Sequence, residues 1–244
     1  MSGRLLAVTP PEILVRDEED ACAYLPGRRA RQPLRAPVRP LTGGEFDLRL
    51  AAGDRRAGTL LYNQSCASCS ACEALRVDVR AFAPSRSQRR AQAKGDAALS
   101  VELGPIEVDD ARLALYRAHE RGRGLDREGR PPIDALEYES YFAVSCVEGF
   151  EIRYRLGGRL AAVAITDRGA RALSAVYTFW DPALAGLSLG TYSILTQIAL
   201  ARRWDLDWVY LGLAIRQNRS MAYKLAFRPH ERRIDGTWRR FTRA

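Results

Sequence analysis

The 244-residue chain has no apolar run near the roughly 20 residues that a membrane-spanning helix needs. Its N-terminal stretch, MSGRLLAVTPPEILVRDEED, also lacks the compact apolar block and the small-residue cleavage site of a secretory signal. Hydrophobic residues make up 47% of the chain and charges are interspersed, which predicts a soluble globular protein of one large or two modest domains. We therefore expect a cytoplasmic protein without a membrane partner.

Histidine and lysine are scarce: His119, His230, Lys94 and Lys224 are the only ones. Two isolated histidines favour neither a histidine metal site nor a Ser–His–Asp triad, and no P-loop or GxGxxG motif stands out. The use of arginine in place of lysine is what a GC-rich, alanine-rich coding sequence produces. The formal net charge of +9 is a separate feature, and it indicates a polyanionic partner, most often a nucleic acid.

Cysteine is also rare, but three of the five cysteines lie together in CASCSAC, as Cys66, Cys69 and Cys72. An odd number so clustered does not predict a disulfide framework; in a reducing compartment it indicates metal ligation or free thiols. With Cys22 as a fourth ligand, the three could close a zinc or iron–sulfur site. Cysteine is also among the residues most often buried, so small thiols that pack beside a pocket are the alternative.

The first half of the chain predicts mixed structure. Residues 22–40 are rich in proline and arginine, which predicts an extended or looped basic segment, and a short apolar helix or strand follows. GDRRAG at 53–58 predicts a glycine-bounded turn, and the alternation in 74–82 predicts a half-buried strand. Ser85 then caps a helix with a basic stripe. That stripe consists of Arg86, Arg89, Arg90 and Lys94.

The second half predicts a helix within 104–124 and a loop or linker over 122–134. Three strands are then expected at 150–156, 159–167 and 172–180, the first two joined at Gly157–Gly158 as a hairpin. A long helix capped by Ser188, the strand 207–213, the short helix 220–227 and a last strand complete the chain. This is the element order of the acyl-transferring core of GNAT acetyltransferases, although many α+β domains share it.

Two segments of this half could carry chemistry. GLSLGT opens the long helix, where free N–H groups and Gly190 could receive a phosphate, or simply form a well-packed helix start. RSMAYKLAF contains Tyr223, which could protonate a leaving group if its hydroxyl faces a cleft, or could pack on an apolar stripe. Both interpretations stay open from the residues alone.

A set of segments together resembles a known family. They are CAYLPGR, GDRRAGTLLYNQSCASCSACEALRVDV, FAPSRSQRR, AVAITD, AVYTFWDP, LSLGTYSIL, VYLGL and MAYKLAFRP, in this order from about Cys22 to about Phe241. The chain is similar to the arginyl/leucyl-tRNA–protein transferases, and within them to the bacterial aspartate/glutamate leucyltransferases. Eukaryotic relatives carry a CxxC pair where this chain has Cys22 and Leu25, so the resemblance does not extend to their iron–sulfur ligands.

The resemblance implies an α+β protein with a smaller N-terminal, cysteine-containing α+β module (1–103) and a C-terminal GNAT-like core (104–244). The core would be a mixed, largely antiparallel sheet flanked by helices. The implied reaction moves leucine from leucyl-tRNA to the α-amine of a protein that begins with Asp or Glu, marking it for degradation. An arginyl-tRNA donor is the alternative within the family, and DNA is not an implied partner.

An aminoacyl ester is already activated, so the implied reaction needs no ATP, covalent intermediate or cofactor, only proximity, a neutral amine and a proton for the leaving ribose oxygen. An iron–sulfur cluster or zinc on the cysteines is compatible with it but not required. The alternative of another class is a non-enzymatic zinc- and RNA-binding protein, which would leave the element order of the second half unexplained.

On this interpretation Tyr223 is the candidate acid, and Ser188 and Thr191 are further catalytic candidates. The acceptor carboxylate requires a cation, preferably a bidentate arginine. The pool for this role is Arg76, Arg86, Arg89, Arg90 and Lys224. The other candidate substrate-binding residues are Tyr24, Gln88, Arg117, His119, Gly190 and Tyr210. The basic segments 28–39 and 228–243 are expected to contact the tRNA backbone.

Overall fold

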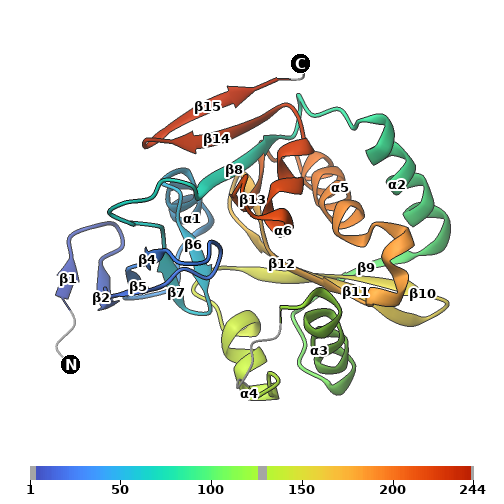
Figure 1. The fold of residues 1–244 in the computed structure, drawn as a ribbon, viewed down its shortest axis with the longest axis horizontal. Helices are drawn as coiled ribbons and strands as arrows, with labels where there is room; N and C mark the ends of the chain where they lie inside the picture. The colour runs from blue at the N-terminus through green and yellow to red at the C-terminus, as the bar shows by residue number, and fades with distance from the viewer. Residues whose placement is uncertain (1–3, 126–130, 243–244) are drawn as a thin grey trace.

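The centre of the fold is a mixed eight-stranded sheet (Figure 1). A computed structural model describes residues 4–125 and 131–242. The strands of the sheet are β8 (Glu73–Asp78), β9 (Ser100–Gly104), β10 (Gly149–Leu156), β11 (Arg159–Arg168), β12 (Ala172–Trp180), β13 (Trp208–Ala214), β14 (His230–Ile234) and β15 (Thr237–Phe241). Their order is β15-β14-β8-β13-β12-β11-β10-β9, and every neighbouring pair except β12–β13 is antiparallel.

Helices cover both faces of this sheet (Figure 1). The helical elements are α1 (Gly43–Ala51), α2 (Arg86–Ala98), α3 (Asp110–Arg123), α4 (Ala135–Tyr138), α5 (Leu189–Arg203) and α6 (Arg219–Ala222), the π-helix η1 (Glu139–Ala143), and the 3-10 helices η2 (Pro182–Leu187) and η3 (Tyr223–Ala226). Helices α2 and α5 pack on one face, where Tyr192 and Leu195 enter the largest core cluster. Helix α3 and the α4–η1 segment pack on the other face through Tyr116, Tyr138 and Phe142. Among the described residues, no helix combines the length and apolar character needed to cross a membrane.

The N-terminal part forms smaller sheets beside the main one (Figure 1). Five short strands pair in the order β1-β2-β5-β7-β6: β1 (Arg4–Leu6), β2 (Glu12–Arg16), β5 (Leu34–Pro37), β6 (Arg55–Ala57) and β7 (Leu60–Tyr62). A separate pair consists of β3 (Glu19–Ala21) and β4 (Arg29–Arg31). The basic segment 22–40 is extended, as predicted, because its prolines preclude a helix.

The predicted α+β class is confirmed, as a largely antiparallel sheet flanked by helices. Each predicted strand of the 150–180 meander is present, and Gly157 and Gly158 both have positive φ at its first hairpin. Helix α2 begins with the predicted cap: Gln88 N donates to Ser85 Oγ, and Ser85 N donates to Gln88 Oε1. Strand β9 and most of the N-terminal strands were not predicted.

Three local predictions need correction. GDRRAG is not one turn, because residues 55–57 form β6, paired with β7, between turns at Gly53 and Gly58, whose φ values are 92° and 59°. Ser188 stands at the N-cap of α5 as predicted, but its φ is 55° and its side chain makes no capping hydrogen bond. The predicted 122–134 loop begins inside α3, and residues 126–130 of it lie outside the described residues.

The two predicted segments meet in the main sheet. Strand β8 lies between β13 and β14, and β9 is the edge strand beside β10. Strand β8 belongs to the predicted segment 1–103, and β9 begins in that segment and ends at Gly104, just past its boundary. The N-terminal segment therefore supplies strands to the same sheet as the C-terminal one. The division at 103/104 stays a prediction.

The parallel pair β12–β13 is hydrogen-bonded only at its start. Its register covers Ala172↔Trp208, Leu173↔Val209 and Ser174↔Tyr210, and β13 then shifts register against β8 between Tyr210 and Gly212. Gly212 has a φ of 72°, which a glycine adopts without strain. The strands separate beyond this point, and ligands of α/β sheets commonly bind at such openings beyond the carboxyl ends of strands.

Candidate active site

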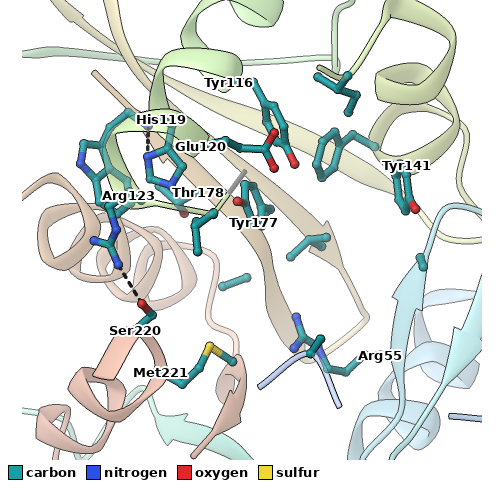
Figure 2. A pocket seen from close by; sticks show the side chains of 18 of the residues that line it. Arg55, Tyr116, His119, Glu120, Arg123, Tyr141, Tyr177, Thr178, Ser220 and Met221 are labelled. Atoms are coloured by element: carbon teal, nitrogen blue, oxygen red, sulfur yellow. Dashed lines mark hydrogen bonds between the residues drawn. The ribbon is translucent and has the colours of Figure 1, made fainter. Parts of the chain in front are cut away.

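A cavity of ≈730 Å³ lies where β12 and β13 separate (Figure 2). Its lining includes Tyr24, Arg55, Arg56 and Tyr62 from the N-terminal part; Tyr116, Arg117, His119, Glu120 and Arg123 from α3; Val176, Tyr177, Thr178 and Trp180 from β12; Ile194 from α5; Leu211 from β13; and Asn218, Ser220, Met221, Tyr223 and Lys224 from the α6–η3 segment. Segments far apart in sequence therefore share one site. Four of these residues, Val176, Ile194, Leu211 and Met221, give the cavity an apolar section.

A carboxylate and two phenols form one wall of the cavity. Tyr116 and Glu120 are one turn apart on α3, and Tyr177 faces them from β12, with the two tyrosine rings 5.6 Å apart (Figure 2). Burial, followed by the charge of Glu120, raises the pKa of Tyr177 to about 12, and burial raises the pKa of Tyr116 further. Both phenols are therefore protonated at neutral pH. Among the described lining residues, Glu120 supplies the one carboxylate.

His119 is neutral in this site. Its Nδ1 accepts the Trp180 N–H at 3.3 Å, and its ring lies edge-on to the Trp180 ring at 4.1 Å (Figure 2). Burial and the nearby Arg123 charge lower the pKa of His119 to about 4. Because Nδ1 is an acceptor, the ring proton lies on Nε2. The guanidinium of Arg123 lies 5.2 Å from the Trp180 ring centre and donates to Ser220 Oγ at 3.3 Å.

Tyr223 lies beside the first turn of α5, close to Trp180. A Cβ added to Gly190 would lie 3.3 Å from Trp180 Cη2 and 4.0 Å from Tyr223 Oη, so the three groups are neighbours. Tyr223 as a whole residue is 41% exposed, but its hydroxyl lies in buried surroundings. This burial raises the pKa of Tyr223, and the Arg123 charge partly opposes the increase. Of the predicted helix-start residues, Gly190 is thus adjacent to the cavity; Ser188 is exposed, and Thr191 is half-buried and outside the lining.

Two cations lie at the opposite side of the cavity, on β6 and on η3. Lys224 Nζ donates to Leu213 O at 3.2 Å, and burial together with the Arg55 charge lowers the pKa of Lys224 to about 7. Tyr24 lines the same part of the cavity, and its carbonyl accepts from Asn218 Nδ2 at 3.0 Å. The predicted Lys224 and Tyr24 are therefore brought together with Arg55, which the sequence did not single out.

Two other arginines of the cavity, Arg56 and Arg117, have partners inside the protein. Both carboxylate oxygens of Asp167 accept from Arg56, at 2.7 and 2.8 Å, and both residues are buried. The predicted Arg117 donates to Ile133 O at 2.9 and 2.6 Å, which ties α3 to the segment before α4. Arg117 therefore lines the wall with its guanidinium already bound to backbone.

Several predicted residues lie away from this cavity. The guanidinium of Arg76 lies between the rings of Trp208 (3.8 Å) and Trp238 (4.3 Å) and donates to Glu231 and to Tyr210 Oη. Arg76 and Tyr210 thus form a separate, internally paired cluster. Gln88 is buried, and its Nε2 donates to Ala226 O at 3.3 Å. The remaining stripe residues Arg86, Arg89, Arg90 and Lys94 are exposed on the surface of α2.

The basic segments predicted to contact tRNA are partly paired with carboxylates of the protein itself. Arg31 pairs with Asp17, and Arg35 pairs with Glu12 and Asp54. In the C-terminal segment the buried Arg232 pairs with Glu73, and residues 243–244 are not described. The exposed positive charge is therefore smaller than the sequence count implies, and the tRNA contact stays a prediction.

Four cysteines meet beside the active-site cavity. Cys22, Cys66, Cys69 and Cys72 line a small cavity of ≈50 Å³, and Tyr24 lines both cavities. Burial and the other three sulfurs raise the pKa of Cys72 to about 12. Within residues 4–125 and 131–242, no group of three or more His, Cys, Asp or Glu side chains is arranged to hold a metal ion. The donors suit a thiolate site in type but not in this arrangement.

A cavity of this size that joins apolar side chains to a carboxylate and phenols is a candidate ligand site, and comparison with known proteins identifies the family. Residues 20–90 match the sequence model of the arginine-tRNA-protein transferase N terminus, and residues 111–234 match that of its C terminus. The chain belongs to the arginine-tRNA-protein transferase family and is an aminoacyltransferase. The alternative of a non-enzymatic RNA-binding protein is therefore wrong.

Curated relatives share most of the chain. The aspartate/glutamate leucyltransferase of Thiobacillus denitrificans is 39% identical over 221 residues, which cover 89% of this chain and 90% of the relative. The same-named proteins of Chromobacterium violaceum (38%; 89% of each chain) and Halorhodospira halophila (39%; 89% and 92%) match similarly. Among solved structures, L-PGS from Bacillus licheniformis (12% identity, TM-score 0.47, 70% of this chain and 58% of that one) and FemX (8%, 0.49, 81% and 68%) are more distant.

Proposed function

We propose that this enzyme moves leucine from leucyl-tRNA to the α-amine of proteins that begin with Asp or Glu, and that it does so in the cytoplasm as a step toward their degradation. The names of the relatives support the assignment, since they match over about nine-tenths of the chain. The observation that carries it is the composition of the cavity: its lining combines apolar side chains with Glu120 and two protonated tyrosines. A volume of ≈730 Å³ is that of a ligand site.

The chemistry is direct aminolysis of the ester. The neutral amine nitrogen of the acceptor attacks the leucyl carbonyl carbon, the new C–N bond forms, and the bond to the ribose oxygen breaks. Glu120 accepts the proton that the amine loses, and the protonated Tyr116 beside it helps to orient the carboxylate. Tyr223 donates the proton that the ribose oxygen gains. The α-amine has an ordinary pKa of roughly 8, so a modest local effect keeps it neutral for attack.

The core that presents these groups is, in this proposal, GNAT-like. Three features support it: the antiparallel meander β10–β12, the separation of β12 from β13, and the start of α5 beside the cavity. The 3′ end of leucyl-tRNA would enter along Gly190, and the exposed stripe on α2 would meet its phosphates.

The reaction as proposed requires no cofactor. Zinc or an iron–sulfur cluster on Cys22, Cys66, Cys69 and Cys72 would be structural, and no step depends on it. Metal analysis of the purified protein, with transfer measured before and after chelation, tests this separately.

Arginyl-tRNA is the second candidate donor, and Glu120 is the observation in its favour, because a carboxylate could pair with an arginyl side chain. The deciding experiment offers leucyl- and arginyl-tRNA separately with peptides that begin with Asp, Glu, Arg or Lys. We expect product only from leucyl-tRNA with Asp or Glu peptides. Transfer of arginine but not leucine would replace the proposed donor, and no transfer with any pair would overturn the function.

A further inference from the structure

We propose that Arg55 is the specificity residue for the acceptor, its guanidinium binding the side-chain carboxylate of the N-terminal Asp or Glu inside the cavity. This inference rests on the proposed function and adds the residue that selects the acceptor. Arg55 is half-buried, lines the cavity and comes from β6, in the segment before the cysteine cluster (Figure 2).

The first observation is that Arg55 has no anion of its own. Within the described residues, no hydrogen bond or ion pair joins its guanidinium to a carboxylate. The carboxylate whose charge acts on it is Asp167, and Arg56 already occupies both oxygens of Asp167. Its other electrostatic neighbours include Tyr24 and Tyr62. A cation removed from water without a partner is costly, and an incoming carboxylate would relieve that cost.

The second observation is that the backbone holds this guanidinium in place. Arg55 pairs with Tyr62 in the β6–β7 register, and its guanidinium packs on Gly212, where β13 shifts register. A Cβ at Gly212 would lie 2.7 Å from Arg55 Cζ and 2.9 Å from each Nη. Three such similar distances mean that the flat face of the group covers the glycine. Its N–H edges then do not point at the glycine, which leaves them free for bidentate donation to a carboxylate.

The third observation is a second cation beside the first. Lys224 lines the same part of the cavity, and the charge of Arg55 contributes to lowering its pKa to about 7. A carboxylate placed between the two would favour the charged form of Lys224. The other cations first considered for this role are placed differently: Arg76 is paired with Glu231, and Arg86, Arg89 and Arg90 lie on the outer surface of α2.

The test compares Arg55→Met with wild-type enzyme on four peptides that differ only in their first residue: Asp, Asn, Glu or Gln. For each, kcat/KM is measured with saturating leucyl-tRNA, and the Kd of leucyl-tRNA is measured over a range of salt. We expect transfer to Asp and Glu peptides to fall on the order of 100-fold, the loss of two charge-assisted hydrogen bonds. The Asp/Asn ratio should approach 1, while leucyl-tRNA affinity stays unchanged.

Two further variants complete the test. Arg55→Lys keeps the charge without the fork and should retain part of the Asp/Asn ratio. Arg203→Met removes one exposed charge from the last turn of α5 and should leave the ratio at its wild-type value. Retained leucyl-tRNA binding by Arg55→Met shows that the variant is folded.

Two outcomes would overturn the proposal: an Asp/Asn ratio in Arg55→Met that stays at its wild-type value, whether or not both rates fall, or a weakened leucyl-tRNA complex with a shallower salt dependence, which would assign Arg55 to a phosphate. A wild-type enzyme that transfers no leucine would overturn the proposed function itself, whatever Arg55→Met does.

Discussion

Substituting Gly212 by alanine should separate the stability of the fold from the selection of the acceptor. Gly212 has a φ of 72°, and an alanine in the left-handed region costs about 1–2 kcal/mol. In a protein of this size that cost lowers the melting temperature by about 2–8 °C. Its new Cβ would also meet Arg55 Cζ at 2.7 Å, where an ordinary contact is 3.4 Å or more. The guanidinium is the end of a flexible side chain, so it moves away at little cost in stability.

That movement of the guanidinium should strongly lower the activity. A displacement approaching 1 Å in a positioning group can lower the rate about 100-fold. We therefore expect Gly212→Ala to lose transfer to Asp and Glu peptides by about 10- to 100-fold, and to lose its Asp/Asn discrimination as Arg55→Met does.

The matched control is Gly27→Ala, because Gly27 has the same φ of 72° but no atom within 4 Å of an added Cβ. Thermal unfolding of the two variants should give similar losses, and steady-state assays on Asp and Asn peptides should separate them. The reasoning is refuted if Gly212→Ala keeps the wild-type Asp/Asn ratio, or if Gly27→Ala loses it equally.

Three other substitutions test the remaining roles. Tyr223→Phe should lower single-turnover leucine transfer by about 100-fold or more at unchanged leucyl-tRNA affinity, since it removes the proton donor; a wild-type rate would exclude that role. Glu120→Gln should lose a similar factor at pH 7 and recover as pH rises through the amine pKa, whereas a pH-independent loss would contradict its role as base. Lys224→Met should raise the melting temperature most at or below about pH 7, because the folded pKa is lowered to about 7 and the wild-type protein bears the full cost of the buried charge there. This gain should shrink as pH rises toward the ordinary lysine pKa, and a pH-independent gain would show that packing, not charge, is responsible.

Local signals predicted the elements of the second half well. The alternating β10–β12 meander was visible because Gly157–Gly158 enforces a tight hairpin and each strand has β-branched or aromatic residues. Helix α2 was visible because Ser85 and Gln88 cap it. The prediction of one turn at GDRRAG was wrong, although both of its glycines do form turns. Pairing with β7 makes the residues between the glycines a strand.

The candidate site was less visible because its parts are distant in sequence. Lys224 and Tyr223 stood out by scarcity and by family resemblance, and both line the cavity. The sequence made Arg76 a reasonable candidate for the acceptor carboxylate, but in the fold it is paired with Glu231, which lies 155 residues away. In the sequence, Glu120 lies on one of several possible faces of the predicted 104–124 helix. Only the fold places Tyr177 against it.

Arg55 and Arg56 show most clearly what sequence order leaves undecided. Both arginines line the cavity, but Arg56 is bound to the buried Asp167, whereas the guanidinium of Arg55 covers Gly212 and pairs with no carboxylate among the described residues. The pair Arg56–Asp167 is buried, with side chains 1% and 0% exposed, and removing one partner of such a pair costs about 3–5 kcal/mol. Arg56→Met should therefore lower the melting temperature by about 6 °C or more, measured by thermal unfolding.

Arg55→Met should leave the melting temperature near the wild-type value, because no carboxylate among the described residues is hydrogen-bonded or ion-paired to the side chain that it removes. Arg55→Met should instead reduce the selection of acidic acceptors. Equal destabilisation by the two variants would mean that Arg55 holds the fold together as Arg56 does. Arg55 would then be a residue that stabilises the fold and not one that recognises the acceptor.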